Sequence, residues 1–224
     1  RRDPALQGAE IARDRFGHRQ RRPISITTRS PEKNSRQGLA MDVIETAIPE
    51  VKKLIPRRFG DNRGWFTESY NKDRLAEAGI TADFVQDNHS FSADIGTVRG
   101  LHFQAPPHAQ GKLVRVTRGR VLDVAVDIRK GSPTFGAWVS EELTGEGGEQ
   151  LWVPRGFLHG FVTLTPDVEL LYKVDAYYSP EADGAVRFDD PDIGIDWQVD
   201  TSQAVLSAKD AAAPWFRDFE TPFV

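Results

Sequence analysis

The chain of 224 residues contains no cysteine and a single methionine, Met41. Without cysteine it can form no disulfide, zinc–thiolate site or cysteine nucleophile, and its composition fits a reducing compartment such as the cytoplasm. It also lacks any apolar run near the ~20 residues that a membrane-spanning helix needs. We therefore expect a cytoplasmic protein with no membrane segment and no thiol chemistry.

Positive charge is scarce in most of the chain and concentrated at its start. Residues 1–40 carry ten Lys or Arg and four Asp or Glu, whereas the rest carries nineteen basic and twenty-nine acidic residues. Neutralisation of phosphates dominates binding to nucleic acids, so an acidic body is a poor partner for them. We expect no nucleic-acid partner.

The first forty residues show almost no periodic pattern of apolar residues. This composition predicts a disordered basic tail, and its acidic residues and missing hydrophobic core argue against a targeting peptide. A normal apolar pattern begins at Met41 with MDVIETAIPEV. We expect residues 1–40 to be a dispensable tail or upstream extension, the natural start to be Met41, and residues 41–224 to form one domain.

Beyond Met41 the chain is a series of short segments rich in Val, Leu, Phe and Trp, several of which alternate polar and apolar residues. Alternation is the period of a half-buried strand. The predicted strands are VIETAI, VRVTRGRV, VLDVAVDI, AWVSEEL, QLWVP, GFVTL and VELLYKV. The turns between them contain Gly and Pro and are RKGSPTFG, TGEGGEQ, VPRGF, SPEADG and DDPDIG. Many strands at this spacing predict an all-β barrel or double-sheet jelly roll.

Two segments predict short peripheral helices. NKDRLAEAGI has a helical pattern that Gly79 would end, and SAKDAAAPW near the C-terminus is a second candidate.

Strand parity indicates which side chains share a cavity, because residues two apart point to the same side. On this basis Lys112, His159 and Tyr172 each point inward beside apolar neighbours. Arg99 and His102 have opposite parity, so a regular strand would separate them, and Gly100 between them would permit a bend.

A buried histidine, tyrosine and lysine form a reasonable set for proton transfer next to a carbonyl. Imidazole is a usable base at neutral pH, a phenol can deliver a proton from another side, and an ammonium can stabilise the enolate between these events. Each residue also has an ordinary structural alternative. Histidines are more often structural than catalytic, and a tyrosine in an apolar strand is by default a core residue.

A metal site is not expected. Metalloenzymes of this kind of fold usually present two histidines two residues apart together with a carboxylate and a third histidine. Here His102 and His108 are six apart, and GFLHGF adds only His159. This spacing does not supply the three or four ligands that a metal needs.

Several long motifs follow one another along the chain. They are FGDNRGWFTESY, FVQDNHS, VRGLHFQ, QGKLVRV, GRVLDVAVDIRKGSPTFG, QLWVPRGFLHGF, YKVDAYYSP and LSAKDAAAP. Together, from about Val43 to Pro214, they resemble the dTDP-4-dehydrorhamnose 3,5-epimerase family. The resemblance implies a cupin-type double-sheet jelly roll, a homodimer paired through N-terminal strands and no metal or other cofactor. It implies an isomerase that converts dTDP-4-dehydro-6-deoxy-α-D-glucose to dTDP-4-dehydro-β-L-rhamnose in dTDP-L-rhamnose biosynthesis.

The resemblance assigns four catalytic residues. His102 matches the base that removes the protons at C3 and C5, and Asp210 matches the carboxylate paired with it, which orients the ring as in hydrolase triads. Tyr172 matches the acid that returns a proton to the opposite face. Lys112 matches the residue beside the C4 oxygen, where an ammonium stabilises the enolate.

The remaining matched positions would contact the substrate. Tyr178 matches an aromatic residue that stacks on thymine, and arginines suit the diphosphate because their fork binds two oxygens. Asp183 matches a family Glu position only loosely. The full set is Arg63, Glu68, Gln86, Asp87, Asn88, Arg99, His159, Tyr178, Asp183 and Lys209.

Two alternatives stay open on the sequence. The first is an epimerase of a related nucleotide deoxysugar that inverts only C3 or only C5, which would carry nearly the same residues. The second is a non-catalytic cupin that binds a nucleotide sugar. The presence of His102, Tyr172, Asp210 and Lys112 argues against the second, because a silent relative should have lost at least one of them.

Overall fold

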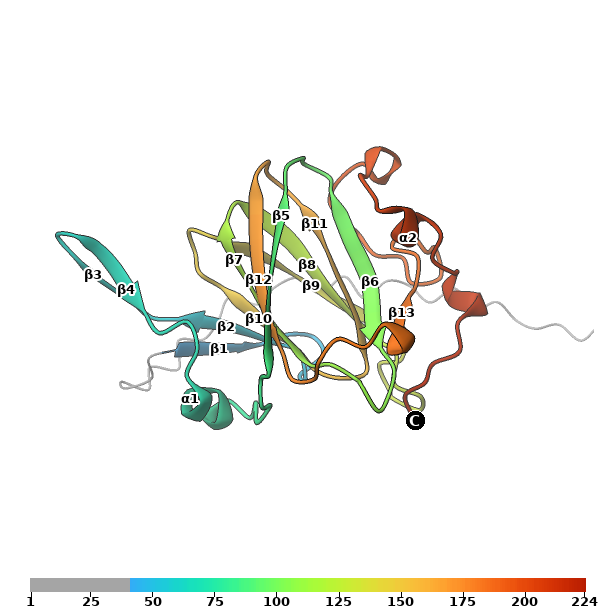
Figure 1. The fold of residues 1–224 in the computed structure, drawn as a ribbon, viewed down its shortest axis with the longest axis horizontal. Coiled ribbons are helices and arrows are strands. Elements are labelled where there is room, and N and C mark those ends of the chain that lie inside the picture. The colour runs from blue at the N-terminus through green and yellow to red at the C-terminus, as the bar shows by residue number, and fades with distance from the viewer. Residues whose placement is uncertain (1–40) are drawn as a thin grey trace, which may run out of the picture.

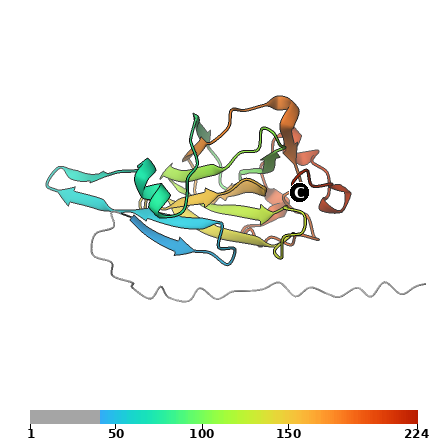
Figure 2. The same cartoon turned by 90° about the horizontal axis from the view of Figure 1, so that it is seen from below.

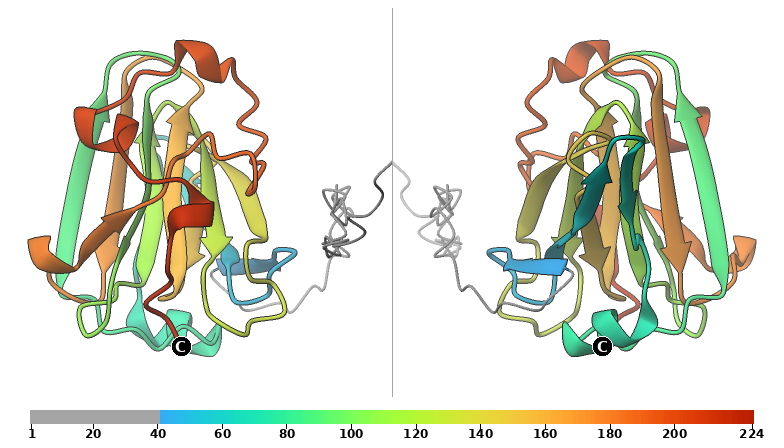
Figure 3. Two further views of the ribbon diagram at one scale, coloured as in Figure 1. Left: turned by 90° about the vertical axis from the view of Figure 1, so that its right-hand side faces the viewer. Right: turned by 90° about the vertical axis from the view of Figure 1, so that its left-hand side faces the viewer.

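The computed structural model describes residues 41–224, which form two antiparallel sheets that face each other (Figures 1 and 3). The predicted tail, residues 1–40, lies outside the described residues. The all-β, double-sheet jelly roll expected from the alternating segments is therefore confirmed for the part of the chain in which those segments lie.

The first sheet has six strands. In spatial order they are β1 (Met41–Glu45), β2 (Lys52–Pro56), β10 (Gln150–Val153), β7 (Lys112–Arg118), β12 (Val168–Val174) and β5 (Gln86–Ser92). The predicted N-terminal strand is thus placed within its own chain, with β2 inserted between β1 and β10. Within residues 41–224, β1 pairs on one side only.

The second sheet has five strands. They are β13 (Asp183–Ala185), β6 (Val98–Gln104), β11 (Phe157–Thr163), β8 (Arg120–Asp127) and β9 (Trp138–Thr144). The segment SPEADG, predicted only as a turn, forms a 3-10 turn at Pro180–Ala182 and then β13, because Asp183–Ala185 pair with the edge of β6.

Two strand predictions were too long. The predicted strand VRVTRGRV is broken at Gly119, whose φ of +80° suits glycine, and there the chain crosses from β7 in one sheet to β8 in the other. The predicted strand VIETAI ends at Glu45. The Thr46 hydroxyl donates to the carbonyls of Ile48 and Val51, both at 2.8 Å, and closes a turn there.

Both predicted helices are present and short. Helix α1 (Lys72–Glu77) is capped by Asn71, whose side chain accepts from the backbone of Asp73, and Gly79 follows its end with φ of +80°. Helix α2 (Ala208–Ala211) is capped by Ser207. The other helical turns are Thr201–Gln203 and Phe216–Asp218. No helix of residues 41–224 is long and apolar enough to cross a membrane.

Apolar side chains fill the space between the sheets and also cover the outer face of the five-stranded sheet. The C-terminal segment, with α2, runs beside β6 and β13 in Figure 1 and packs Phe188, Trp197 and Phe223 against that outer face. All seven residues of β11 are therefore buried, as expected for a strand covered on both sides. Because the outer face is covered, the functional side chains of this sheet lie on its inner face, between the two sheets.

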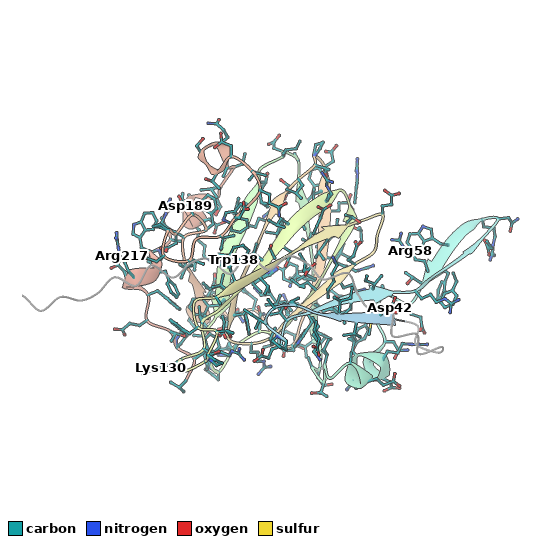
Figure 4. All side chains as sticks on the ribbon, turned by 180° about the vertical axis from the view of Figure 1, so that it is seen from behind. Asp42, Arg58, Lys130, Trp138, Asp189 and Arg217 are labelled. Atoms are coloured by element: carbon teal, nitrogen blue, oxygen red, sulfur yellow. The ribbon has the colours of Figure 1, made fainter. Side chains whose placement is uncertain are left out.

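A hairpin that the sequence did not predict projects from the opposite end of the molecule. Strands β3 (Arg58–Asp61) and β4 (Gly64–Thr67) form a separate two-stranded sheet that extends away from the body (Figures 1 and 2). Arg58 marks its base, far from Arg217 at the other end (Figure 4). Its aromatic residues Phe59, Trp65 and Phe66 are exposed.

Candidate active site

One pocket brings together side chains from both sheets, and half of the candidate residues line it. Its wall includes His102 from β6, Lys112 from β7 and Tyr172 from β12. The complete lining is Gln86, Asn88, His102, Phe103, Gln104, Gln110, Lys112, Tyr172, Tyr178 and Asp183. Two other hollows lie at the base of the hairpin, but neither is lined by histidine or tyrosine.

His102 is paired with a buried carboxylate. Its Nε2 lies 2.6 Å from Oδ1 of Asp210, which α2 holds against β6 with only 3% of its surface exposed. Burial raises the pKa of Asp210, but the hydrogen bond and charge of His102, together with hydrogen bonds from Ser207 and the Gly100 backbone, outweigh burial and keep that pKa below its usual value. A carboxylate can only accept, so Nε2 carries the proton and Nδ1 remains as the basic nitrogen.

The bend predicted at Gly100 is present and is what brings Arg99 and His102 to one face. Arg99 pairs with Phe161 and His102 with His159, so three steps on β6 match two on β11. Such a bulge reverses the parity of the strand. Gly100 has φ of +132°, and a Cβ there would lie 2.6 Å from Cα of Gly160, so only glycine fits.

Tyr172 approaches the pocket from the sheet opposite His102. Burial raises its pKa, although the charge of Arg99 acts in the other direction, so the phenol keeps its proton at neutral pH. Arg99 is held near β5 because it donates to Ser92 Oγ at 3.1 Å and to the carbonyl of Phe91 at 2.9 Å. The pocket therefore carries a base and an acid on different walls.

His159 and Asp123 form a polar pair inside the apolar interior, and Lys112 lines the pocket. His159 Nε2 lies 2.9 Å from Oδ1 of Asp123, and both residues are buried. Burial lowers the pKa of His159 against the opposing effect of Asp123, so the imidazole is neutral at pH 7. Burial also lowers the pKa of Lys112, to about 8, which leaves an ammonium at neutral pH.

Asp123 is a candidate that the sequence reasoning missed. It occupies the middle of VLDVAVD, on the same face as Val121 and Ala125, which belong to the core between the sheets. A carboxylate at an inward position of an apolar strand was the available signal, since isolated buried charges are costly. The parity argument used for Lys112 would have found it.

Five of the predicted substrate-binding residues meet at the mouth of the pocket. The Tyr178 hydroxyl donates to Asp183 Oδ2 at 3.0 Å, and Lys209 forms an ion pair with the same carboxylate. Gln86 accepts a hydrogen bond from the Tyr178 backbone at 3.3 Å and donates to Asn88 at 2.9 Å. Asp183, which matched its family position only loosely, is thus central to this group.

The structure does not bring Asp87, Arg63 or Glu68 to the pocket of their own chain. Asp87 lies between Gln86 and Asn88 on β5, so its side chain points to the other face, where it pairs with Lys173 at 2.8 Å. Arg63 lies at the hairpin turn, with 83% of its side chain exposed and Asp61 as its partner. Glu68 follows the hairpin and pairs with Arg74 at 2.9 Å.

Comparison with known proteins shows the family of this chain. The model of the dTDP-4-dehydrorhamnose 3,5-epimerase family matches residues 45–218. The enzyme of that name from Sinorhizobium fredii is 56% identical over 168 residues, covering 75% of this chain and 86% of that protein.

Solved structures agree as well. The Bacillus anthracis enzyme with TDP and PPi bound has a TM-score of 0.77 at 51% identity, covering 79% of this chain and 100% of that one. A 3,5-epimerase from Legionella pneumophila in complex with dTDP-4-keto-L-rhamnose also scores 0.77, at 48% identity, covering 80% and 95%. With these matches, the chain belongs to the dTDP-4-dehydrorhamnose 3,5-epimerase family.

Proposed function

We propose that this protein is an isomerase that inverts C3 and C5 of dTDP-4-dehydro-6-deoxy-α-D-glucose. The product is dTDP-4-dehydro-β-L-rhamnose, and the pathway is dTDP-L-rhamnose biosynthesis. The observation that carries the proposal is the pocket itself, in which a carboxylate-paired His102 and a protonated Tyr172 come from opposite sheets. Inversion needs one group that removes a proton and another that delivers one from the far side.

The chemistry follows from the C4 ketone. Protons at C3 and C5 are acidic because the ketone turns each carbanion into an enolate. His102 Nδ1 takes the proton, and Asp210 stabilises the imidazolium that forms. The Lys112 ammonium stabilises the negative charge on the enolate oxygen. Tyr172 then protonates the carbon from the other face. Exchange with solvent removes the proton from His102 and returns one to Tyr172, and repetition at the second carbon completes the reaction.

The remaining polar groups bind the nucleotide. Tyr178, 56% exposed at the mouth of the pocket, offers its ring to the thymine. Lys209 and Arg99 supply positive charge for the diphosphate. Gln86, Asn88, Asp183 and His159 complete the contacts that we propose within one chain, and Asp87 would act through its backbone, because its side chain faces away.

Incubation with the ketosugar nucleotide in heavy water tests the proposal. We expect deuterium at both C3 and C5, together with the L-rhamno product, measured by NMR. Label at one carbon only would instead indicate a single-centre epimerase. Binding of the nucleotide sugar without any label would indicate a non-catalytic binding protein.

The proposed reaction uses no cofactor, because every step moves a proton between the substrate and a side chain. The proposed compartment is the cytoplasm, since a chain without cysteine fits a reducing environment.

We further propose that the active form is a homodimer in which the N-terminal strands meet the partner. Within residues 41–224 the outer edge of β1 has no neighbouring strand, and the hairpin beside it exposes Phe59, Trp65 and Phe66. Arg63 and Glu68 lie outside their own pocket, so a partner that receives the hairpin would account for their expected role.

Shortened chains test the dimer together with the proposal that residues 1–40 are dispensable. A chain starting at Met41 should remain dimeric by light scattering and fully active, whereas one starting at Phe59, which lacks β1 and β2, should lose both properties. A monomeric and fully active Met41 chain would contradict the dimer. An inactive Met41 chain would show that the first forty residues are needed.

A further inference from the structure

Gln104 is a buried amide at the end of β6, and the proposed reaction gives it no role. It lines the same pocket as Tyr178, although only 4% of its surface is exposed. A buried amide costs free energy unless its oxygen and its nitrogen both have hydrogen-bond partners. The partners of Gln104 therefore show which parts of the molecule it holds together.

The side chain of Gln104 is occupied by backbone groups of two other segments. Its Nε2 donates to the carbonyl of His108 at 2.7 Å and to the carbonyl of Tyr177 at 3.2 Å. Its Oε1 accepts from the backbone N–H of Ser179 at 2.8 Å. Both protons of the amide nitrogen are thus used, so Gln104 has no donor left for a ligand and acts on the backbone.

Two of these bonds hold the peptide groups on either side of Tyr178. The backbone N–H of Tyr178 itself donates to Oε1 of Gln86 at 3.3 Å. Residues 177–179 follow β12 and belong to no strand. Two glutamine side chains therefore hold this stretch in place, and Gln104 makes the two shorter bonds of the three.

The tip of the Tyr178 ring is tied to the same pair of strands. Gln104 on β6 pairs with Asp183 on β13, and Oδ2 of Asp183 accepts from the Tyr178 hydroxyl at 3.0 Å. Tyr178 is 56% exposed, so packing alone does not fix its ring. Attachment at both the backbone and the hydroxyl gives the ring a defined direction at the mouth of the pocket.

A defined direction of this ring matters for affinity. Stacking of a base on an aromatic side chain contributes about 5- to 150-fold in affinity. A side chain that is already ordered before the ligand arrives does not have to be ordered on binding, and this saves conformational entropy. The residue that orders the ring should therefore strengthen binding without touching the base.

We propose that Gln104 is a positioning residue that holds the Tyr178 backbone so that the ring is ready to stack on the pyrimidine of a nucleoside diphosphate. The inference deepens the proposed function and rests on it for the assignment of Tyr178 to the base. Without Gln104 the ring loses its fixed direction, whereas His102 and Tyr172, which make no hydrogen bond to Gln104 in the described residues, keep their places.

The substitution Gln104→Met tests this, because it keeps the shape of the side chain and removes all three bonds. Asp190→Leu is the matched control. Asp190 is also buried and accepts from three backbone N–H groups outside the pocket, those of Asp192, Ile193 and Phe216 at 2.8, 3.2 and 2.7 Å. The readouts are the Kd of dTDP by calorimetry, and KM and kcat with the ketosugar nucleotide.

In Gln104→Met we expect the Kd of dTDP and the KM to rise by about tenfold, within the range that base stacking contributes, while kcat changes little. Asp190→Leu should lower the melting temperature and leave the Kd of dTDP at the wild-type value. If Gln104 acts through Tyr178, its loss should add little once the ring is gone. Gln104→Met should therefore weaken dTDP binding much less in a Tyr178→Ala background.

Wild-type affinity for dTDP in folded Gln104→Met would overturn the proposal. An equal loss of affinity with and without the Tyr178 ring would also overturn it, because Gln104 would then act on another part of the site. Should Gln104→Met fail to fold, Gln104→Glu decides. It keeps the acceptor for Ser179 but cannot supply both donors, so unchanged dTDP affinity in that variant would overturn the proposal as well.

The dTDP titration needs no turnover, so it separates this inference from the proposed function. A tenfold loss of dTDP affinity in Gln104→Met, in a protein that does not epimerise the ketosugar, would reject the proposed function and leave the role of Gln104 standing. Normal epimerisation together with wild-type dTDP affinity in Gln104→Met would reject the role of Gln104 and leave the proposed function standing.

Discussion

The interior between the sheets and the projecting hairpin both carry residues that the family resemblance assigns to the substrate, yet their environments are opposite. In the interior, Asp210 and His159 are buried and held by single short contacts. On the hairpin, Arg63 is mostly exposed and pairs with Asp61 two residues away. Exposed pairs of this kind contribute little free energy.

This difference indicates that the interior carries out proton transfer, whereas the hairpin completes the binding site. Burial shifts the pKa values of Lys112, His159 and Tyr172, which is what proton transfer requires. The side chains of the hairpin are not buried by their own chain, so they gain a defined role only when another surface covers them. The interior should therefore decide whether the reaction occurs, and the hairpin whether the substrate is held.

The largest effect is expected for His102→Ala. One base serves both carbons, so deuterium exchange at C3 and at C5 should fall together by ~10²–10⁴-fold. His89→Ala is the control, because His89 is exposed on β5 and faces Glu169 at 3.4 Å. Exchange at the wild-type rate in His102→Ala would show that another group is the base.

Tyr172→Phe should separate exchange from inversion. The ring still packs against the core, so the melting temperature should change little, while the proton donor is lost. Deuterium exchange through His102 should then be reduced less than net inversion, when both are measured on the same samples by NMR. Equal loss of exchange and inversion in a folded variant would give Tyr172 another role. Tyr70→Phe, on the hairpin side of the molecule, should behave as wild type.

Mixing two inactive variants tests whether the hairpin serves a partner. Arg63→Ala and His102→Ala should each be impaired, and dimers formed from both chains should regain activity, because one pocket then has both intact groups. The control is a mixture of His102→Ala and Tyr172→Phe. It should stay inactive, because each pocket then lacks either the His102 imidazole or the Tyr172 hydroxyl. No recovery in the first mixture, with exchange of chains verified, would place Arg63 outside the partner's pocket.

Asp127→Asn should affect stability and its dependence on acid. Burial raises the pKa of Asp127, but hydrogen bonds from Arg129, Ser132 and Thr134 outweigh burial and bring it to about 2. Because the folded pKa is below the usual 3.8, this stabilisation is present above about pH 4 and lost as pH falls toward 2.

We expect Asp127→Asn to lower the free energy of unfolding by about 2 kcal/mol at neutral pH and to flatten its fall below pH 4. Urea titrations at several pH values measure both. Equal acid sensitivity in the variant and the wild type would show that other carboxylates dominate. Deuterium exchange into the substrate by the folded variant should stay near wild type, unlike that of the interior variants.

The smallest effect is expected from chelation. No group of three or more His, Asp or Glu within residues 41–224 is arranged to hold a metal ion. Treatment with a chelator should leave epimerisation unchanged. Loss of activity that a divalent ion restores would contradict the metal-free mechanism and assign the enolate charge to a metal in place of Lys112.

Much of the interior was predictable because strand alternation is a local property. The inward direction of Lys112 and Tyr172 followed from parity within apolar strands, and both line the pocket. Arg99 and His102 have opposite parity, and the glycine between them permitted a bend, which the structure shows as a bulge. The hairpin was missed because FGDNRGWFT has no apolar alternation on which a strand prediction rests. Asp123 was predictable, because strand parity in VLDVAVD places its carboxylate inward beside Val121 and Ala125.

The sequence alone indicated the class of fold and the family, and its ordered motifs proposed four catalytic residues together with the pairing of Asp210 with His102. Only the tertiary structure showed that Asp123 binds His159 and that Arg63 lies outside its own pocket. Such contacts depend on how the sheets twist and face each other, so they join residues that no local pattern connects.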